Sequence, residues 1–435
     1  MKELLLTLLY LLLANLLIFR FNRLQFSAFK PFVTVLIFNI KFLVGILVWM
    51  IYTFYYSNYR HSDIHKFYQD ALVLNSLAHE HPVSFAKILV NKYDSFSSDA
   101  TAHMAHWYRN FDESPFNENQ TIIKLNALLM FLTLKTYFIH VLFFCFFSLI
   151  GWVLLTNAVF YRTGWPASII SLPVMMLPSV LFWTSGILKE PVLVLGLGLT
   201  VSAILSGKIN WKNAAMLSAG CLIMLHTKFY VLASLIPPIA AFLVCKRDLD
   251  VSAIVGKYIA VNAIAFVLAF NIHQFVPGIN LQQMLMNKQM NAIKEAMYFK
   301  AGSRIDIERV NSDVSSVIKA GLAGIRNVIF RPYMWETENV MMLAGALENV
   351  FIFFMLILCI RAGVRNSEKQ LNLFLFLFNF SLLYFALVGM ATPVLGNLVR
   401  YKAPVLPFFL YAFSVLVKPE KLPHQLDFLR RKQVV

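Results

Sequence analysis

The sequence has little charge and few cysteines, and it lacks the glycine-rich motifs that bind nucleotides. Only 14% of the 435 residues are charged, while 59% are hydrophobic. All four cysteines fall inside apolar runs, which argues against a disulfide framework. Because no P-loop or dinucleotide fingerprint occurs, the sequence does not support chemistry driven by ATP or by a nucleotide sugar.

Long apolar runs take the place of these missing features. Soluble domains are typically about 45–50% apolar, and this chain is well above that range. The composition therefore predicts an integral membrane protein. The formal net charge is +16, and the basic residues lie mainly in short gaps between apolar runs, where the positive-inside rule places them. We therefore do not expect nucleic acid as a partner.

The apolar runs predict an all-α, polytopic helix bundle that forms one membrane domain over residues 1–435. Short basic gaps place the N-terminus outside and the C-terminus in the cytoplasm. Two polar segments, residues 57–136 and 277–338, are predicted as outer-face insertions, the second with helical patterns at 282–301 and 306–325. The eleven predicted spans cover residues 3–19, 32–56, 137–160, 166–183, 192–205, 214–225, 230–245, 258–276, 340–360, 371–390 and 403–417.

The first insertion opens with the stretch YRHSDIHKFYQD, residues 59–70. If the segment is helical, Asp63 and Asp70 face the same way, about 10 Å apart along the axis. This separation is too long for an acid/base pair, but it suits one catalytic carboxylate with a second acid nearby. The structural alternatives are an N-cap role for Asp63 or Ser62 and a solvated helix face for Asp70.

Charged residues from distant parts of the sequence return to the same predicted face. Lys189 and Glu190 lie between the fourth and fifth spans, Arg331 precedes the ninth, and Arg400 and Lys402 precede the eleventh. A lipid phosphate needs Arg or Lys at headgroup depth, and an attacking sugar hydroxyl needs a carboxylate base. The alternatives are a mutually satisfied Lys189–Glu190 pair and an interfacial anchor at Arg400.

Histidines in the first insertion raise the question of a metal site. His61 and His65 are spaced i, i+4, and His103 and His106 are spaced i, i+3, so either pair fits one helix face. No glutamate lies inside the first pair as in HExxH, and no cysteine is available in the outer segments. Exposed loop histidines are the simpler interpretation. We therefore expect no metal and no other cofactor.

The order of these parts resembles the GT-C superfamily of polytopic membrane glycosyltransferases, which includes lipid-A aminoarabinose transferases and protein mannosyltransferases. The matching positions are Asp63, Tyr68 and Asp70 in HSDIHKFYQDA and Arg400 in LVRYKAPVLPF. The segments FWTSGILKEP and RPYMWE resemble parts of uncharacterised bacterial membrane proteins of that class. Two features depart from the family pattern: the first outer loop follows the second span rather than the first, and no adjacent acidic pair occurs near Asp63.

The resemblance implies an enzyme of the bacterial inner membrane. It would transfer a sugar from a polyprenyl-phosphate carrier to a lipid or glycan acceptor at the outer, periplasmic face. Asp63 would deprotonate the acceptor hydroxyl, and Asp70 would orient the acceptor or tune Asp63. The other implied site residues are Arg400, Lys402 and Lys189 for the carrier phosphate and Glu190, Tyr68 and Arg331 for the rest of the substrate.

Two other functions fit the same sequence. A transporter or flippase for a lipid-linked or anionic substrate needs charges near the membrane midplane, and Lys41 and Glu348 lie inside predicted spans. A non-catalytic scaffold would use the outer insertions to bind a partner protein. An outer cavity that holds Asp63 and a basic residue within reach of lipid would favour the enzyme.

Overall fold

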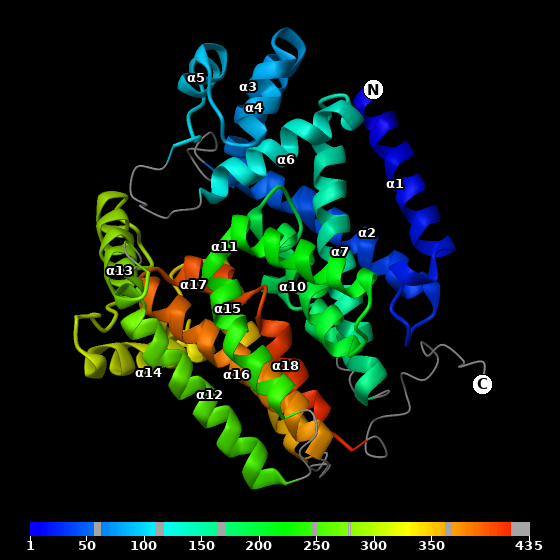
Figure 1. Cartoon of the computed structure of the whole chain (residues 1–435). Coiled ribbons are helices and arrows are strands. Elements are labelled where there is room, and N and C mark those ends of the chain that lie inside the picture. The colour runs from blue at the N-terminus through cyan, green and yellow to red at the C-terminus, as the bar shows by residue number, and fades with distance from the viewer. Residues whose placement is uncertain are drawn as a thin grey trace.

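The computed structural model describes residues 1–55, 62–108, 117–163, 171–245, 250–276, 278, 280–361 and 368–418, and this part of the chain is all-α (Figure 1). Its helices are α1 (Lys2–Arg20), η1 (Asn22–Leu24), α2 (Pro31–Met50), η2 (Ile51–Tyr55), α3 (Asp63–Glu80), α4 (Pro82–Leu89), α5 (Ser95–Ala102), α6 (Glu118–Thr133), α7 (Tyr137–Thr163), α9 (Pro178–Trp183), α10 (Lys189–Ser206), α11 (Trp211–Val244), α12 (Val251–Asn271), η4 (Ile272–Gln274), α13 (Leu281–Tyr298), α14 (Val314–Phe330), η5 (Met334–Glu336), α15 (Val340–Arg361), α16 (Glu368–Ala391), α17 (Leu395–Lys402) and α18 (Leu406–Val415).

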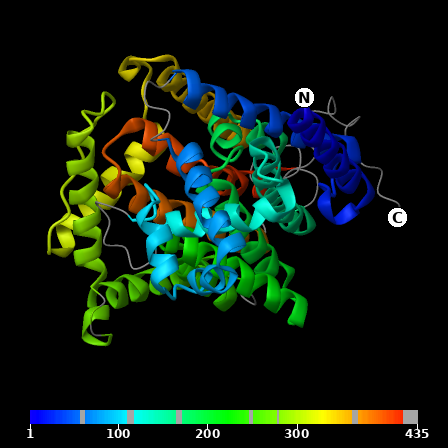
Figure 2. The same ribbon diagram turned by 90° about the horizontal axis from the view of Figure 1, so that it is seen from above.

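Eight of the described helices are long and apolar enough to cross a membrane. They are α1, α2 continued through η2, α7, α10, α11, α12, α15 and α16. The prediction of a helical membrane protein is confirmed at this level. The exposed leucines along α1 and the mostly exposed surface of α12 are the apolar faces that lipid would cover. The two views place α1 and α13 at opposite edges of the molecule (Figures 1 and 2).

The structure does not confirm the predicted count of eleven spans. The fourth predicted span falls partly on residues 164–170, which lie outside the described residues, and its last part is α9, a helix of six residues that starts at Pro178. The eleventh is α18, which has ten residues and starts beside Pro407. Proline removes a backbone donor and favours the first turn of a helix, so it divides these apolar runs into short helices.

The sixth and seventh predicted spans both lie within α11, but the chain changes direction there. The backbone of Lys228 is not helical, with φ −151° and ψ 85°. Lys228, at this break, contacts Glu190 at the start of α10. Near the end of α11, the ring centroid of Phe242 lies 5.7 Å from the guanidinium carbon of Arg162. Arg162 in turn donates to the carbonyl of Leu205, near the end of α10. The second half of α11 therefore runs back alongside α10, in agreement with the turn at the boundary between these two predicted spans.

The second insertion differs from its predicted helix boundaries. The helix predicted from residue 306 begins only at Val314, because the Asp313 side chain accepts a hydrogen bond from the N–H of Ser316 and caps α14 there. Residues 306–313 form no helix or strand. Two backbone hydrogen bonds join the residues just before this segment to the start of α17. Ile305 donates to the carbonyl of Pro393, and Leu395 donates to that of Ser303.

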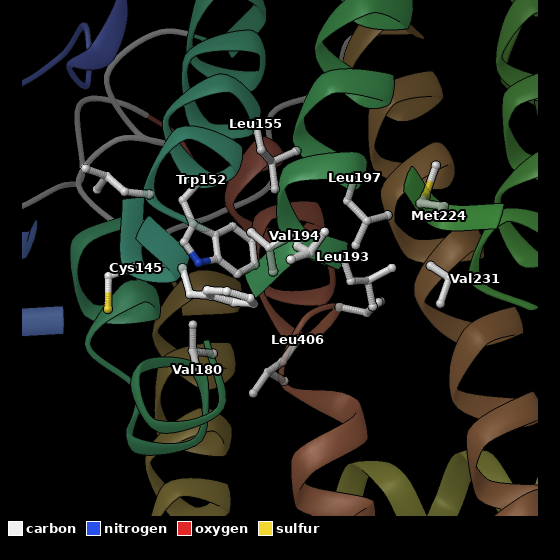
Figure 3. Packing of buried hydrophobic residues seen from close by; sticks show 14 of the residues in the cluster. Cys145, Trp152, Leu155, Val180, Leu193, Val194, Leu197, Met224, Val231 and Leu406 are labelled. Atoms are coloured by element: carbon white, nitrogen blue, oxygen red, sulfur yellow. The ribbon is translucent and has the colours of Figure 1, made fainter. Parts of the chain in front are cut away.

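Helices α7, α10 and α11 pack closely around small residues. Gly198 of α10 faces the backbone of Gly151 in α7, and Gly220 of α11 faces Gly196 and Thr200 of α10. Small residues allow helix backbones to approach closely inside a membrane. The packing places the first turn of α10, with Lys189 and Glu190, at a fixed position. Figure 3 shows the apolar side chains of this core, including Trp152, Leu155, Leu193, Val194, Leu197, Met224, Val231 and Leu406.

Replacing Gly198 with valine is expected to lower the free energy of unfolding by about 3 kcal/mol, because the new side chain would overlap the backbone of Gly151 and push α7 and α10 apart. Reversible unfolding of the purified protein in mixed detergent micelles measures the change. The matched control is Gly256→Ala in α12, where a Cβ has no neighbour within 4 Å and should stabilise the helix by about 0.5–1 kcal/mol. Equal stability of Gly198→Val and the wild type would contradict the close contact.

Candidate functional site

Arg400 of α17 is held between two carboxylates from distant parts of the chain. Its Nη1 lies 2.7 Å from Oδ2 of Asp63, the first residue of α3. Its Nε and Nη2 donate to Oε1 and Oε2 of Glu190 on α10, at 3.0 and 3.3 Å. This second contact has the two-pronged geometry that distinguishes Arg from Lys. The ring of Trp183, at the end of α9, lies 5.2 Å from the guanidinium carbon and adds a cation–π contact.

Glu190 is shared between two cations. Besides the contact with Arg400, its Oε1 accepts a hydrogen bond of 3.1 Å from Nζ of Lys228, at the break in α11. The Lys228 ammonium lies 4.3 Å from the ring centroid of Tyr401. The Glu190 side chain is 0% exposed, so its charge depends wholly on these partners. Helices α10, α11 and α17 are therefore joined by one buried carboxylate.

A second ion pair, between Lys189 and Glu118, lies beside the contacts of Glu190. Lys189 Nζ is 3.0 Å from Oε2 of Glu118 in the first turn of α6, and it lies 5.6 Å from the ring of Phe67. The alternative of a Lys189–Glu190 pair is therefore wrong, since these neighbours bind different partners. We refer to the set formed by Asp63, Glu118, Lys189, Glu190, Lys228 and Arg400 as the Arg400 cluster. It contains three carboxylates and three cations.

Exposure falls steeply across the cluster. The Asp63 side chain is 34% exposed, that of Arg400 is 13% exposed, and that of Glu190 is fully buried. Burial alone would raise the pKa of the Asp63 carboxyl, but Arg400, with Lys189 and Lys66, holds it well below its usual range. Asp63 is therefore an ionised group at the accessible edge of the cluster. Glu190 is the carboxylate at the buried end of the cluster.

The helix that carries Trp183 is held by a charge at each end. At its start, Glu348 of α15 accepts hydrogen bonds of 2.6 Å from both the N–H and the hydroxyl of Ser179. At its end, Lys41 of α2 donates to the carbonyl and the hydroxyl of Thr184, at 3.0 and 2.7 Å. An anion at the N-terminus and a cation at the C-terminus complement the helix dipole. These two intramembrane charges, which the transporter interpretation used, therefore position α9.

Asp70 lies outside the Arg400 cluster. Its carboxylate accepts hydrogen bonds from the backbone N–H groups of Ala105 and His106, at 3.1 and 2.8 Å. Burial raises its pKa, and these two hydrogen bonds partly oppose the rise. The structure therefore places Asp70 as an anchor for the chain that follows α5, rather than on the solvated helix face of the alternative interpretation. A role in orienting an acceptor stays a prediction.

Three further predicted site residues also contact other parts of the chain. The Tyr68 hydroxyl donates to the carbonyl of Lys135. Lys402 is buried, and its Nζ donates a hydrogen bond of 2.6 Å to Oδ1 of Asn349. Arg331 forms a 3.3 Å ion pair with Glu336. Of the predicted site residues, the structure brings together Asp63, Lys189, Glu190 and Arg400, and it places Asp70, Tyr68, Lys402 and Arg331 on separate partners.

Glu118, Lys228 and Trp183 were not among the site residues predicted from the sequence. Lys228 gave a usable signal, because it lies between two apolar runs and a charge there needs a partner. Glu118 lies in a polar stretch and gave none. Regarding metals, no three His, Cys, Asp or Glu side chains come together as ligands within the described residues, and His61 lies outside them.

Comparisons of the chain with protein-family models, with curated proteins and with solved structures gave no match. The case for a function therefore depends on the chemistry of the site. What the geometry provides is a buried, charge-balanced cluster whose accessible edge pairs a carboxylate with a guanidinium.

Proposed function

We propose that the protein is a membrane glycosyltransferase that moves a sugar from a polyprenyl-phosphate carrier to an acceptor hydroxyl. The observation that carries the proposal is the 2.7 Å contact between Asp63 and Arg400 at the accessible edge of the cluster. A carboxylate is the group that can accept a proton from the acceptor, and a guanidinium is the group best suited to a leaving phosphate. The sequence resemblance to GT-C enzymes points to the same two residues.

The differing burial of the two carboxylates suggests how the site would accept its donor. Glu190 is buried and holds two nitrogens of Arg400, whereas Asp63 holds one and is partly exposed. An incoming phosphate would therefore replace Asp63 rather than Glu190. Release from Arg400 would bring the pKa of Asp63 back toward the ordinary carboxyl range, and Asp63 would become a better base. Donor binding would thus prepare the base for the reaction.

The proposed reaction is a displacement with inversion at the anomeric carbon. The acceptor oxygen forms a bond to that carbon, and the bond from the carbon to the carrier phosphate oxygen breaks. The acceptor proton passes to Asp63, and Arg400 neutralises the charge that develops on the phosphate. Lys189 lies close enough to influence the charge of Asp63 and would help to attract the donor. No metal ion or other cofactor is needed for this step.

We also propose the membrane in which the site lies, its orientation, and the class of its donor and acceptor. The charge pattern favours an N-terminus outside and a C-terminus in the cytoplasm. The resemblance to GT-C enzymes favours a bacterial inner membrane, with the Arg400 cluster facing the periplasm. The donor would be a polyprenyl-phosphate-linked sugar that approaches through the membrane lipids. The acceptor would be a lipid or a glycan.

Replacing Asp63 with asparagine tests the proposal. Sugar transfer from a polyprenyl-phosphate donor is expected to fall at least about a hundredfold, because the amide cannot take the acceptor proton. Binding of the donor is expected to stay the same or to tighten, because Arg400 no longer has to release a carboxylate. Transfer assays and donor titrations in proteoliposomes measure both effects. Activity within a few-fold of the wild type would remove Asp63 as the base.

The matched control is Asp99→Asn. Asp99 is an exposed carboxylate in α5, and the ring of His103 lies 3.9 Å from it. This variant is expected to transfer sugar at the wild-type rate, which separates the role of Asp63 from a general effect of lost negative charge on the insertion.

A further inference from the structure

A second polar site lies in the second insertion, between the segment 306–313 and α14. The cleft there has a volume of about 470 Å³, which falls within the range of small-molecule sites. Arg309 lines it from the 306–313 segment, and Lys319 and Arg326 line it from α14. Asp306 and Glu308 line the same cleft. The site therefore presents charges of both signs to one open cleft.

The side chains of Arg309, Lys319 and Arg326 make no hydrogen bond or ion pair within the described residues, and the same is true of the carboxylates of Asp306 and Glu308. Asp313, which also lines the cleft, caps α14 and attracts Lys319 electrostatically. The cleft also contains a buried polar group. Asn327 is 4% exposed and lines the cleft, so its amide can contact a molecule bound there.

The walls of the cleft are fixed by buried contacts. Gln289 of α13 donates to the carbonyls of Glu308 and Met390, at 2.9 and 2.8 Å, and accepts from the N–H of Val310 at 2.9 Å. On the other side, Gly324 of α14 lies against the backbone of Gly389 in α16. The 306–313 segment is therefore joined to α16 through Gln289, and α14 packs against α16 directly, so the opening between them is part of the fold.

An apolar stripe lies next to the cleft on α14. Val314, Ile318 and Leu322 are all exposed, and their spacing of four residues aligns them along the helix. At about 100° per residue, Lys319 and Arg326 lie about 40–60° around the helix from Leu322 and about 120–140° around from Val314. A further face of α14, which includes Ala320 and Val328, is buried against the bundle. Charged and apolar surfaces thus adjoin on one exposed side of α14.

We propose that this cleft binds the headgroup of an ethanolamine phospholipid. The phosphate would lie between Lys319, Arg326 and Arg309, and the ammonium group would donate to Asp306 and Glu308. The acyl chains would cover the adjacent stripe on α14. A headgroup with a phosphate and a primary ammonium matches the two signs of charge, and the stripe selects a lipid over a free phosphate compound. This site is independent of the glycosyl-transfer proposal, since none of its residues belongs to the Arg400 cluster.

Lipid titrations of the full-length, delipidated protein test the site. Native mass spectrometry would count the lipids retained from dioleoyl phosphatidylethanolamine, phosphatidylcholine and phosphatidylglycerol. The ethanolamine lipid is expected to bind about tenfold more tightly than the other two, because choline cannot donate to the carboxylates and glycerol carries no cation. The double variant Lys319→Gln/Arg326→Gln is expected to weaken its binding about a hundredfold. Equal binding of the three lipids, or an unaffected double variant, would overturn the proposal.

Two further variants distinguish the sources of the phosphate and control for charge. Ile318→Ser is expected to weaken lipid binding several-fold and to leave the binding of soluble phosphoethanolamine unchanged. If soluble phosphoethanolamine or inorganic phosphate binds as tightly as the lipid, the stripe has no role and the lipid assignment is wrong. The control is Lys294→Gln, an exposed α13 residue outside the cleft, which should bind lipid as the wild type does. The substituted side chains are exposed, and thermal unfolding of each variant verifies that it is folded.

Discussion

Replacing Arg400 with glutamine is expected to destabilise the protein by about 3–5 kcal/mol and to abolish sugar transfer. The reason lies in Glu190, whose side chain is 0% exposed and whose carboxylate takes two hydrogen bonds from the guanidinium. Without Arg400, Glu190 keeps only Lys228, and Asp63 loses its principal partner. A buried carboxylate with incomplete compensation is costly. Transfer would fall more than in Asp63→Asn, because donor binding is lost together with catalysis.

Unfolding in mixed micelles and donor titration in proteoliposomes measure the two effects separately. The control for stability is Arg331→Gln, because the Arg331–Glu336 pair is partly exposed and such pairs contribute about 0–1 kcal/mol. Arg400→Lys is informative as well, since lysine keeps the charge but cannot reproduce the two-pronged contact with Glu190. A stable Arg400→Gln protein that still binds the donor with wild-type affinity would contradict both the structural and the functional role.

Replacing Glu190 with glutamine is the second change with a large expected effect, also about 3–5 kcal/mol of lost stability. This carboxylate is the common partner of Arg400 and Lys228, and its removal leaves two cations close together at the end of the bundle. Lys228 is nearly fully buried, so water cannot replace the lost partner. Repulsion between the two cations and the loss of their hydrogen bonds act in the same direction.

A double-mutant cycle with Lys228→Gln separates the pair from other effects. The double variant Glu190→Gln/Lys228→Gln is expected to be at least about 1 kcal/mol more stable than the sum of the single changes predicts, since it removes both partners together. The comparison pair is Lys87 and Asp94, an exposed ion pair at 3.0 Å whose coupling should be below about 1 kcal/mol. Additive losses for Glu190 and Lys228 would show that the buried contact contributes nothing.

Several helices could be predicted almost to the residue. The run predicted at 137–160 is α7, that at 340–360 is α15, and that at 371–390 lies within α16. These segments are long and uninterrupted by proline, so hydrophobicity alone specifies them. The predictions failed where local chemistry overrode hydrophobicity. Proline divides the apolar run that ends in α9, and Asp313 delays the start of α14.

The candidate site was only partly predictable. The sequence placed Asp63, Glu190 and Arg400 next to ends of apolar runs, and it indicated that charges there need partners. It could not identify those partners. Lys189 and Glu190 are neighbours in the chain, yet consecutive helix residues point about 100° apart, so each side chain meets a different helix.

By itself, the sequence determined that this is a helical membrane protein, because the hydrophobic effect acts on composition and on the length of apolar runs. Only the tertiary structure decided that Asp63 and Glu190 share Arg400, and that Lys41 and Glu348 hold the two ends of α9. Ion pairs depend on distances of a few ångströms between side chains from different helices. Such distances are set by how the helices pack, and no local pattern in the chain encodes them.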